Sequence, residues 1–235
     1  MQNPTRHQCL IYEGPPSRHL PALVAVMKQK LQENHRCLYF DSPPMLAGLR
    51  SFLAAGDVDV LAELGKGSLV LSSDQGHLVA GKFDVDRMIE TLKSAVQQAL
   101  QDGYSGLWAT GDMTWEFGPK RDFSKLVEYE WKLEDFIRQN SALGGICLYH
   151  SDTLPRDAMR QGLATHHSLF VNETLSRINP HFIPPDLFNE ESASGPEFDS
   201  ALDELCRFDS KTENRPTSAI CPGSSPGSSF PPAEA

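Results

Sequence analysis

The sequence has no excess of basic residues and no long apolar run. Its 235 residues include 21 Lys and Arg against 31 Asp and Glu, which gives a formal net charge of −10. Nucleic acids and anionic lipid surfaces attract basic proteins, so we expect no direct binding to nucleic acid or to a membrane. No apolar run approaches the length that crosses a bilayer, and the polar start of the sequence shows no export signal. We therefore expect a cytoplasmic protein.

Paired cysteines are also missing. The five cysteines are odd in number, and no two are spaced as C-x-x-C: they are Cys9, Cys37, Cys147, Cys206 and Cys221. The first three lie in apolar runs, where a reduced thiol behaves as a small hydrophobic side chain. His7 and Cys9 share one face of a strand, and residues 166 and 167 are both histidine, but no further ligand has a suggestive spacing. The sequence therefore predicts neither a metal site nor a cofactor.

Two catalytic motifs are absent. No G-x-S-x-G nucleophile elbow occurs, so acyl transfer is not expected. A phosphate loop needs G-x-x-x-x-G-K-[ST] after the first strand, because glycine N–H groups and a lysine hold the phosphates. That place reads Glu13-Gly-Pro-Pro-Ser-Arg-His-Leu20, where two prolines lack N–H groups and Glu13 repels phosphate. We expect no ATP hydrolysis, and a protein that is not an enzyme.

What the sequence does contain is a regular alternation of β-prone runs and helical periods. Strands are predicted at 7–12, 36–40, 68–72, 103–110, 145–149 and 168–171, with a last strand near 181–183. Helices are predicted at 21–34, 43–55, 58–64, 85–102, 122–140 and 155–163. This order predicts an α/β fold in three layers, with a mainly parallel central sheet and helices on both faces.

The composition changes after residue 185. Residues 186–235 hold 10 acidic and 3 basic side chains, and Ser, Pro and Gly dominate after about residue 211. We expect one domain over 1–185 and a largely disordered tail over 186–235. A possible short helix at 198–208 carries one apolar face: Phe198, Ala201, Leu202, Leu205 and Cys206. The pattern leaves open whether this helix docks, onto the same chain or a partner, or forms only transiently.

Polar and aromatic residues follow several predicted strands. The run Gly103–Trp115 is the most prominent, because an apolar strand breaks at Gly111 and delivers Asp112 and Trp115. Ligands of parallel sheets bind beyond the carboxyl ends of the strands. The full set of residues near these ends is Tyr12, Tyr39, Asp41, Asp112, Met113, Trp115, Tyr149 and His150. They predict an aromatic small-molecule pocket with few polar groups, beside a Gly-punctuated loop at 73–82 that is long enough to act as a lid.

Several of these segments together resemble the MEDS domain, the sensory domain named for methanogens, methylotrophs and the regulator DcmR. The matching segments are His7-Gln-Cys-Leu-Ile-Tyr12, Gly81-Lys-Phe-Asp84, Gly103-Tyr, Thr110-Gly-Asp-Met-Thr-Trp115, Tyr129-Glu130, Cys147-Leu-Tyr149, His166 and Asn179-Pro-His-Phe-Ile-Pro-Pro185. The resemblance implies a RecA-like or KaiC-like core without its phosphate loop. It also implies ligand-site residues at the family's motif positions: His7, Tyr12, Asp112, Trp115, Glu130, Tyr149 and His166.

We therefore expect a sensor or regulatory domain for a small molecule, with hydrocarbon derivatives among the candidate ligands. The resemblance implies that it acts in signal transduction or transcriptional control through a partner protein such as a kinase or a transcription regulator. The alternative is a degenerate RecA-like nucleotide-binding protein in which Asp112 still holds a metal ion.

Overall fold

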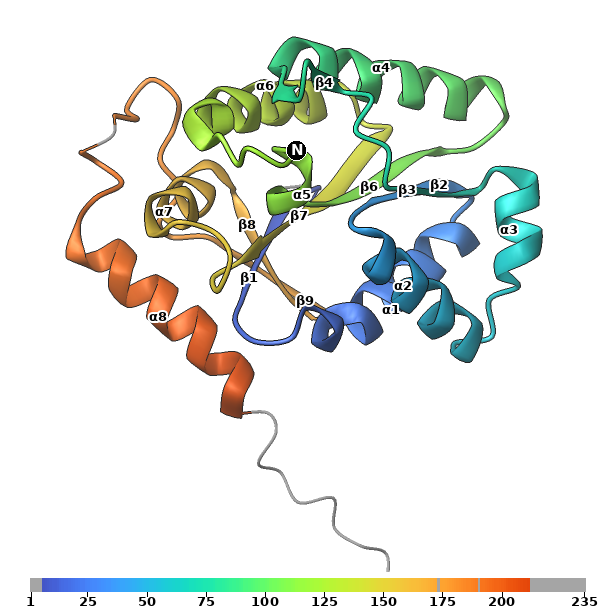
Figure 1. The fold of residues 1–235 in the computed structure, drawn as a ribbon, viewed down its shortest axis with the longest axis horizontal. Helices are drawn as coiled ribbons and strands as arrows, with labels where there is room; N and C mark the ends of the chain where they lie inside the picture. Colours follow the sequence, from blue (N-terminus) through green and yellow to red (C-terminus); the bar gives the residue numbers. More distant parts are fainter. Residues whose placement is uncertain (1–5, 173, 190, 212–235) are drawn as a thin grey trace, which may run out of the picture.

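One seven-stranded sheet organises the chain (Figure 1). The computed structural model describes residues 6–172, 174–189 and 191–211. The strands lie in the order β3-β2-β6-β7-β1-β8-β9, and all pair in parallel except β9, which is antiparallel to β8. Their bounds are β1 His7–Tyr12, β2 His35–Phe40, β3 Leu69–Ser72, β6 Gly106–Asp112, β7 Leu143–His150, β8 Ser168–Asn172 and β9 Leu175–Ile178.

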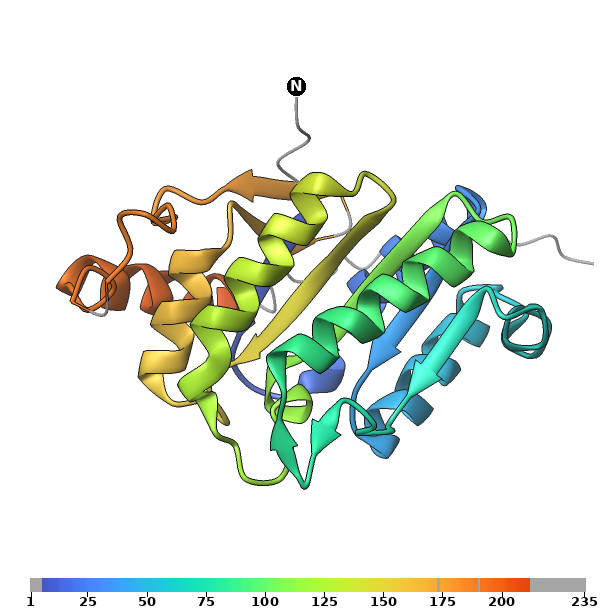
Figure 2. The ribbon, with the colours of Figure 1, turned by 90° about the horizontal axis from the view of Figure 1, so that it is seen from above.

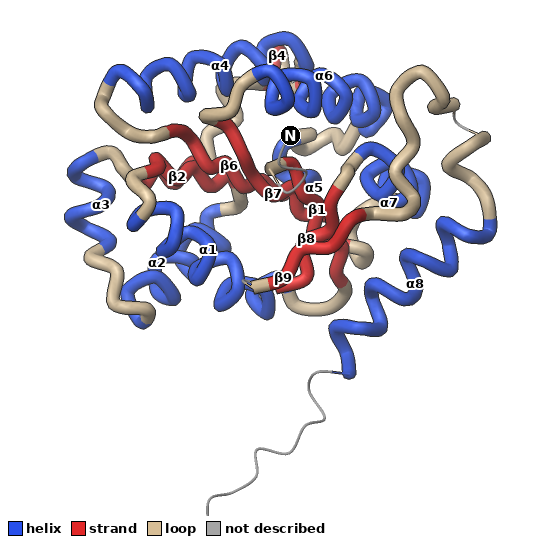
Figure 3. Tube along the Cα trace, turned by 180° about the vertical axis from the view of Figure 1, so that it is seen from behind, coloured by secondary structure: helices blue, strands red, loops and turns tan. Residues whose placement is uncertain are grey.

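Helices cover both faces of the sheet, as the views from the front and from behind show (Figures 1 and 3). One face carries α1 (Leu20–Gln32), α2 (Pro43–Ala55) and α3 (Val60–Lys66). The other carries α4 (Val85–Gln101), α6 (Leu126–Gln139) and α7 (Arg156–Thr165), which lie side by side when seen from above (Figure 2). The α/β prediction is confirmed, and the architecture is consistent with a three-layer RecA-like fold.

The alternation of side chains along the strands builds a separate core on each face. In β1, Cys9 and Ile11 pack with the helices α4, α6 and α7, whereas Leu10 and Tyr12 pack with α1 and α2. This is the period of two that any strand imposes. Because β1 lies between β7 and β8, all six of its residues are buried. A side chain on β1 or β7 therefore meets one helical layer or the other.

The prediction of a last strand near residues 181–183 is wrong. Residues 181–183 form no strand, and the edge strand is β9, which follows β8 directly. Phe182 instead stacks on His167, with ring centroids 3.5 Å apart, and the Ile183 N–H donates to the Ala164 carbonyl at 2.9 Å. Prolines on either side of this segment also remove N–H groups that a sheet would use.

Short elements near the carboxyl ends of the strands were not predicted. The loop at 73–82 contains β4 (Leu78–Val79), which pairs with β5 (Lys82–Phe83). β6 runs through Gly111 and Asp112 and passes straight into a four-residue helix, α5 (Met113–Glu116). Two 3₁₀ turns, η1 (Pro16–His19) and η2 (Phe123–Lys125), precede α1 and α6.

Helix α8 (Pro196–Lys211) lies within the predicted tail and packs against α7 and β1. Its Phe198, Leu202 and Cys206 side chains are buried in the same core as α7. Arg160 on α7 forms an ion pair with Asp199, with a nitrogen-to-oxygen distance of 2.8 Å. In the structure this helix docks onto its own chain. Of the tail predicted to be largely disordered, 186–235, residues 212–235 lie outside the described residues.

Within the described residues, no helix is both long and apolar enough to span a bilayer.

Candidate functional site

An open cleft of about 470 Å³ lies at the edge of the sheet where the strands of the central region end. Below it is called the carboxyl-edge cleft. Asp41 follows β2, Asp112 ends β6 and His150 ends β7, so three neighbouring strands each bring a polar residue to its wall. Trp115 of α5 and Gln75 of the 73–82 loop complete the side nearest α5. A volume of this size accommodates a small molecule.

Asp112 is held in place by the helix that follows it. Its carboxylate accepts the Trp115 N–H at 2.8 Å and thereby caps α5. Burial and the nearby charge of Asp41 raise the pKa of Asp112 to about 7, although N–H groups of α5 act in the opposite direction. This carboxyl group therefore exchanges a proton near neutral pH, which an ordinary aspartate does not.

Asp41 faces the cleft with both oxygens already engaged. The Tyr39 hydroxyl donates to one oxygen at 2.7 Å, and the Ser42 N–H donates to the other at 2.6 Å. Burial nevertheless raises the pKa of Asp41 above its usual value. Two carboxyl groups therefore offer hydrogen-bond acceptors in the cleft wall with reduced negative charge, and Arg121 adds one basic side chain to the same lining.

Trp115 links the cleft to the 73–82 loop. Its carbonyl accepts the Gln75 side-chain amide at 3.3 Å, and the next carbonyl, of Glu116, is hydrogen-bonded to the His77 ring at 2.8 Å. The Trp115 indole N–H is buried and has no hydrogen-bond partner among the described residues. A ligand that contacts the Trp115 side chain therefore touches a helix whose carbonyl groups are hydrogen-bonded to two residues of the loop.

The turn after β1 occupies the place where a nucleotide-binding fold has its phosphate loop, and it is closed to phosphate. The Gly14 N–H already donates to the Asp152 carboxylate at 3.0 Å, and the Gly14 carbonyl is hydrogen-bonded to His150 at 2.8 Å. Tyr12 stacks on the same His150 ring, with centroids 4.8 Å apart, and is buried behind the cleft. The N–H group that would bind a phosphate is thus already bound to a carboxylate.

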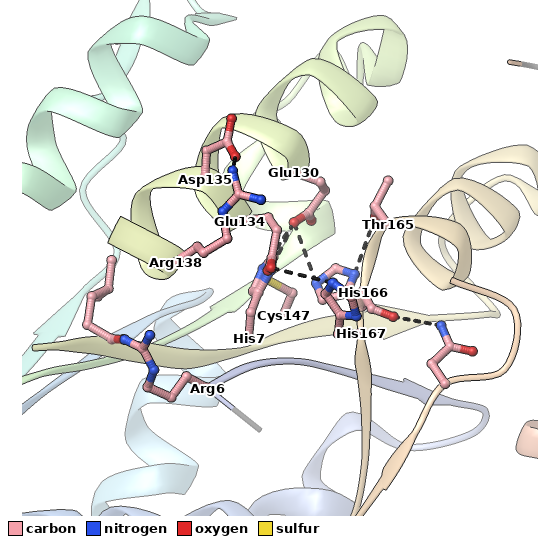
Figure 4. Close-up of polar contacts among 12 residues, drawn as sticks. Arg6, His7, Glu130, Glu134, Asp135, Arg138, Cys147, Thr165, His166 and His167 are labelled. Atoms are coloured by element: carbon pink, nitrogen blue, oxygen red, sulfur yellow. Dashed lines mark hydrogen bonds and ion pairs between the residues drawn. The ribbon is translucent and has the colours of Figure 1, made fainter. Parts of the chain in front are cut away.

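A second group of polar side chains lies on the opposite face of the sheet, buried beneath α6 and α7 (Figure 4). We call it the histidine–glutamate cluster; its members are His7, Glu130, Glu134, Cys147, Tyr149 and His166. They come from β1, α6, β7 and the residue after α7.

Glu130 is the centre of this cluster and is fully buried. The Tyr149 hydroxyl donates to its Oε1 at 2.5 Å. Its Oε2 lies 3.4 Å from His7 Nε2 and 3.5 Å from His166 Nε2. Burial opposes ionisation of Glu130, but the facing His166 and His7 rings outweigh burial and keep its pKa below the ordinary value. A buried carboxylate of this kind needs such partners.

The two histidines differ in protonation. Burial lowers the pKa of His7, but its hydrogen bonds and charge contacts with Glu130 and Glu134 raise it to about 9. Burial lowers the pKa of His166 to about 4, so that ring is neutral at pH 7. The His166 Nδ1 lies 2.8 Å from the Gly162 carbonyl and must donate to it, which leaves Nε2 as an acceptor that faces Glu130.

The seven residues implied by the resemblance do not form one pocket. Asp112 and Trp115 line the carboxyl-edge cleft, Tyr12 is buried behind it, and the other four belong to the histidine–glutamate cluster. The prediction that one aromatic pocket gathers the residues at the carboxyl ends of the strands is therefore wrong for three of them. Tyr149 points to the face of the sheet that α6 and α7 cover, and Met113 and Tyr39 are core residues.

Two members of the cluster were missed in the sequence. Cys147 shares a face of β7 with Tyr149, two residues later, and Glu134 lies one turn beyond Glu130 on α6. These spacings were visible, but the pairing of β1 with β7 that joins them to His7 was not. The neighbours His166 and His167 separate completely, because His166 is buried and the His167 side chain is 45% exposed.

Together these features define a class: a three-layer α/β domain with an open cleft at the carboxyl edge of its sheet and a buried polar cluster beneath one helical layer. The profile of the MEDS family, described as the methanogen/methylotroph, DcmR sensory domain, matches residues 6–167. The chain belongs to the MEDS family. No curated protein gave a significant match.

Proposed function

We propose that this chain is a non-enzymatic sensory domain that binds a small molecule in the carboxyl-edge cleft and acts through a protein partner in signal transduction or transcriptional control. Membership of a sensory-domain family supports the general role. The observation that carries the proposal is the cleft itself, because three parallel strands bring polar residues to one cavity of about 470 Å³ beside an unpaired indole N–H.

The lining of the cleft favours a particular kind of ligand. Asp41 and Asp112 offer acceptors, Trp115 offers an aromatic surface, and Met45 and Pro119 add apolar area. Short aliphatic or aromatic compounds with a hydroxyl or amino group fit this chemistry, and such compounds are hydrocarbon derivatives. Phosphate does not fit it, because acidic groups line the cleft and the Gly14 N–H is already engaged by Asp152. The nucleotide-binding alternative is therefore not favoured.

The connection between α5 and the 73–82 loop supplies a route for the signal. Gln75 and His77 both contact carbonyl groups of α5, so a ligand that moves Trp115 also disturbs the attachment of the loop. A ligand that binds one loop arrangement better than another shifts the population toward it. The partner, such as a kinase or a transcription regulator, then reads the state of the loop.

Ligand binding is testable by thermal shift with a panel of small alcohols, amines and phenols. A binder present at 100 times its Kd is expected to raise the Tm by roughly 5–10 °C. Trp115→Ala is expected to abolish this rise, and Trp131→Phe, on α6 and absent from the cleft lining, to preserve it. If ATP and Mg²⁺ stabilise the protein and Asp112→Ala removes that stabilisation, the chain would instead be a nucleotide-binding protein in which Asp112 holds the metal ion.

Asp112→Asn is expected to stabilise the protein at pH 8. The pKa of Asp112 in the folded protein, about 7, lies above its ordinary value of 3.8, so folding takes up a proton between these pH values. Stability due to this group therefore falls as the pH rises from about 4 to about 7. Asn keeps the N-cap of α5 and removes the charge.

The expected gain at pH 8 is about 1–2 kcal/mol, below the full linkage value because the side chain keeps some contact with water. Asp41 acts to raise this pKa and Arg121 to lower it, so both must be intact in the comparison. Urea unfolding of both proteins from pH 4 to pH 8 measures the difference. A difference that stays constant over this range would contradict the assignment of a raised pKa to Asp112.

A further inference from the structure

We propose that the histidine–glutamate cluster is a zinc site, in which His7 Nε2, Glu130 Oε2, Cys147 Sγ and His166 Nε2 bind one Zn²⁺ ion. These four atoms all lie within 4.8 Å of one another, and all four residues are buried (Figure 4). This inference is independent of the ligand proposed for the carboxyl-edge cleft. None of the four residues lines that cleft.

Four of the six distances between these atoms are close to those of a tetrahedral ligand shell, and all six are within 4.8 Å. Bonds of 2.0–2.3 Å to a tetrahedral zinc place ligand atoms about 3.3–3.6 Å apart. Glu130 Oε2 lies 3.4 Å from His7 Nε2 and 3.5 Å from His166 Nε2. Cys147 Sγ lies 3.7 Å from His7 Nε2 and 4.0 Å from Glu130 Oε2. Small side-chain adjustments are enough to surround an ion.

Outer hydrogen bonds aim the ligand atoms toward one point. The His7 Nδ1–H donates to Glu134 at 2.9 Å, so its Nε2 faces the cluster. The Gly162 carbonyl fixes His166 in the same way, and its Nε2 is buried with no hydrogen-bond partner among the described residues. A carboxylate or a carbonyl on the second ring nitrogen is the usual support of a metal-binding histidine.

Glu130 has a comparable support. The Tyr149 hydroxyl holds Oε1, which leaves Oε2 as the oxygen that faces both histidine rings. Three of the four ligands therefore have an outer partner that fixes their orientation. A set of ligands prepared in this way costs little conformational entropy when an ion binds.

The donor set suits zinc. Two imidazoles, one thiolate and one carboxylate are ligands that Zn²⁺ accepts in tetrahedral geometry. Burial raises the pKa of the Cys147 thiol, which stays protonated until a cation supplies positive charge. On binding, the Cys147 thiol and the His7 Nε2 each lose a proton to solvent. The thiolate and the Glu130 carboxylate then balance the two charges of the ion.

Two side chains at the rim of the cluster are partly exposed to solvent. The His167 ring is 45% exposed, and its Nε2 lies 3.8 Å from Glu134, whose side chain is 15% exposed and contacts His7. A cavity of about 30 Å³, lined by His7 and Cys147 among others, adjoins the same place and has room for about one water molecule. His167 and Glu134 are therefore suited to receive a cation before it enters.

Four protein ligands fill a tetrahedral shell, which is the arrangement of a structural zinc site. The ion would join β1, at the start of the described chain, to α6, β7 and the segment after α7, which begin more than a hundred residues later. We therefore expect zinc to stabilise the fold rather than to activate a substrate.

The direct test is metal binding by the full-length protein. After treatment with a chelator, the protein is expected to bind one equivalent of Co²⁺ with a thiolate-to-cobalt charge-transfer band in the near ultraviolet, and added Zn²⁺ is expected to displace it. Zinc is also expected to raise the Tm. Failure of the wild type to bind a stoichiometric ion would overturn the proposal and leave the cluster as an ion-pair network.

Variants separate this site from adventitious binding. Cys147→Ala is expected to lose the charge-transfer band, and His166→Gln to lower the affinity for Co²⁺ at least 10-fold. Cys37→Ala is the matched control, because Cys37 is an equally buried free thiol on the other face of the sheet. If Cys147→Ala does not fold, Cys147→Ser serves instead, since its hydroxyl gives no such band. A band that persists without the Cys147 thiol would overturn the proposal.

Discussion

Gly145→Ala is expected to destabilise the protein by about 3 kcal/mol or more. Gly145 lies in β7 between β6 and β1, and all its strand neighbours are buried. A Cβ at this position would lie 1.9 Å from the Ala109 carbonyl oxygen of β6. Real Cβ atoms do not approach so closely, and the obstacle is backbone at the centre of the sheet. The strands must therefore move apart, which strains the hydrogen bonds that join them.

Urea unfolding followed by circular dichroism measures this cost. Gly65→Ala is the control, because Gly65 lies in helix α3 and a Cβ there meets no atom within 4 Å. The control is expected to gain up to about 1 kcal/mol, since alanine is the better helix former. Equal unfolding midpoints for Gly145→Ala and the wild type would show that β6 and β7 are not packed as described.

Leu202→Ala is expected to cost about 2–5 kcal/mol and to lower the Tm by roughly 5–15 °C. Leu202 is completely buried, although it lies in the acidic region after residue 185. It belongs to the same core as Met159 and Leu163 of α7, the helix on which α8 packs, so removal of its side chain leaves a cavity in that core. The measurement is thermal unfolding of the full-length protein.

Leu61→Ala is the matched control for this substitution. Leu61 also lies in a helix but is 74% exposed, so its truncation is expected to change stability by less than about 0.5 kcal/mol. If Leu202→Ala behaves like the control, α8 does not pack on α7 in solution. A protein that lacks α8 altogether should be less stable still, because Phe198 and Cys206 leave the core as well.

The sequence was sufficient for most of the fold because its signals are local. Six strands and the covering helices follow from apolar periods and from breakers such as Gly56 and Gly103. The error at residues 181–183 has a tertiary cause: apolar side chains there cover α6 and α7 instead of extending the sheet. The helix at 198–208 and its apolar face were predicted as part of α8, but whether that face docks was left open, because only packing shows it buried.

The candidate site was harder to predict from the sequence, because its residues come together only through tertiary structure. Asp112 and Trp115 were found because the end of one strand places them, which is a local property. The environment of Glu130 was not predicted, because the periodicity of apolar residues in a helix does not show which strand that face of the helix contacts. Its partner His7 lies on β1, and no sequence pattern reveals that β1 inserts between β7 and β8. Which residues come together as the proposed zinc ligands thus depends on the order of the strands in the sheet, and the periodicity of apolar residues does not predict that order.

The central place of β1 also constrains how the protein is made. β1 leaves the ribosome before the other strands of its sheet, yet its partners β7 and β8 begin at residues 143 and 168. At ordinary rates of synthesis, roughly ten to thirty seconds separate them. During that interval Cys9, Leu10 and Ile11 have no sheet to enter. The nascent chain must therefore wait, or be shielded by a chaperone, until nearly the whole domain has been translated.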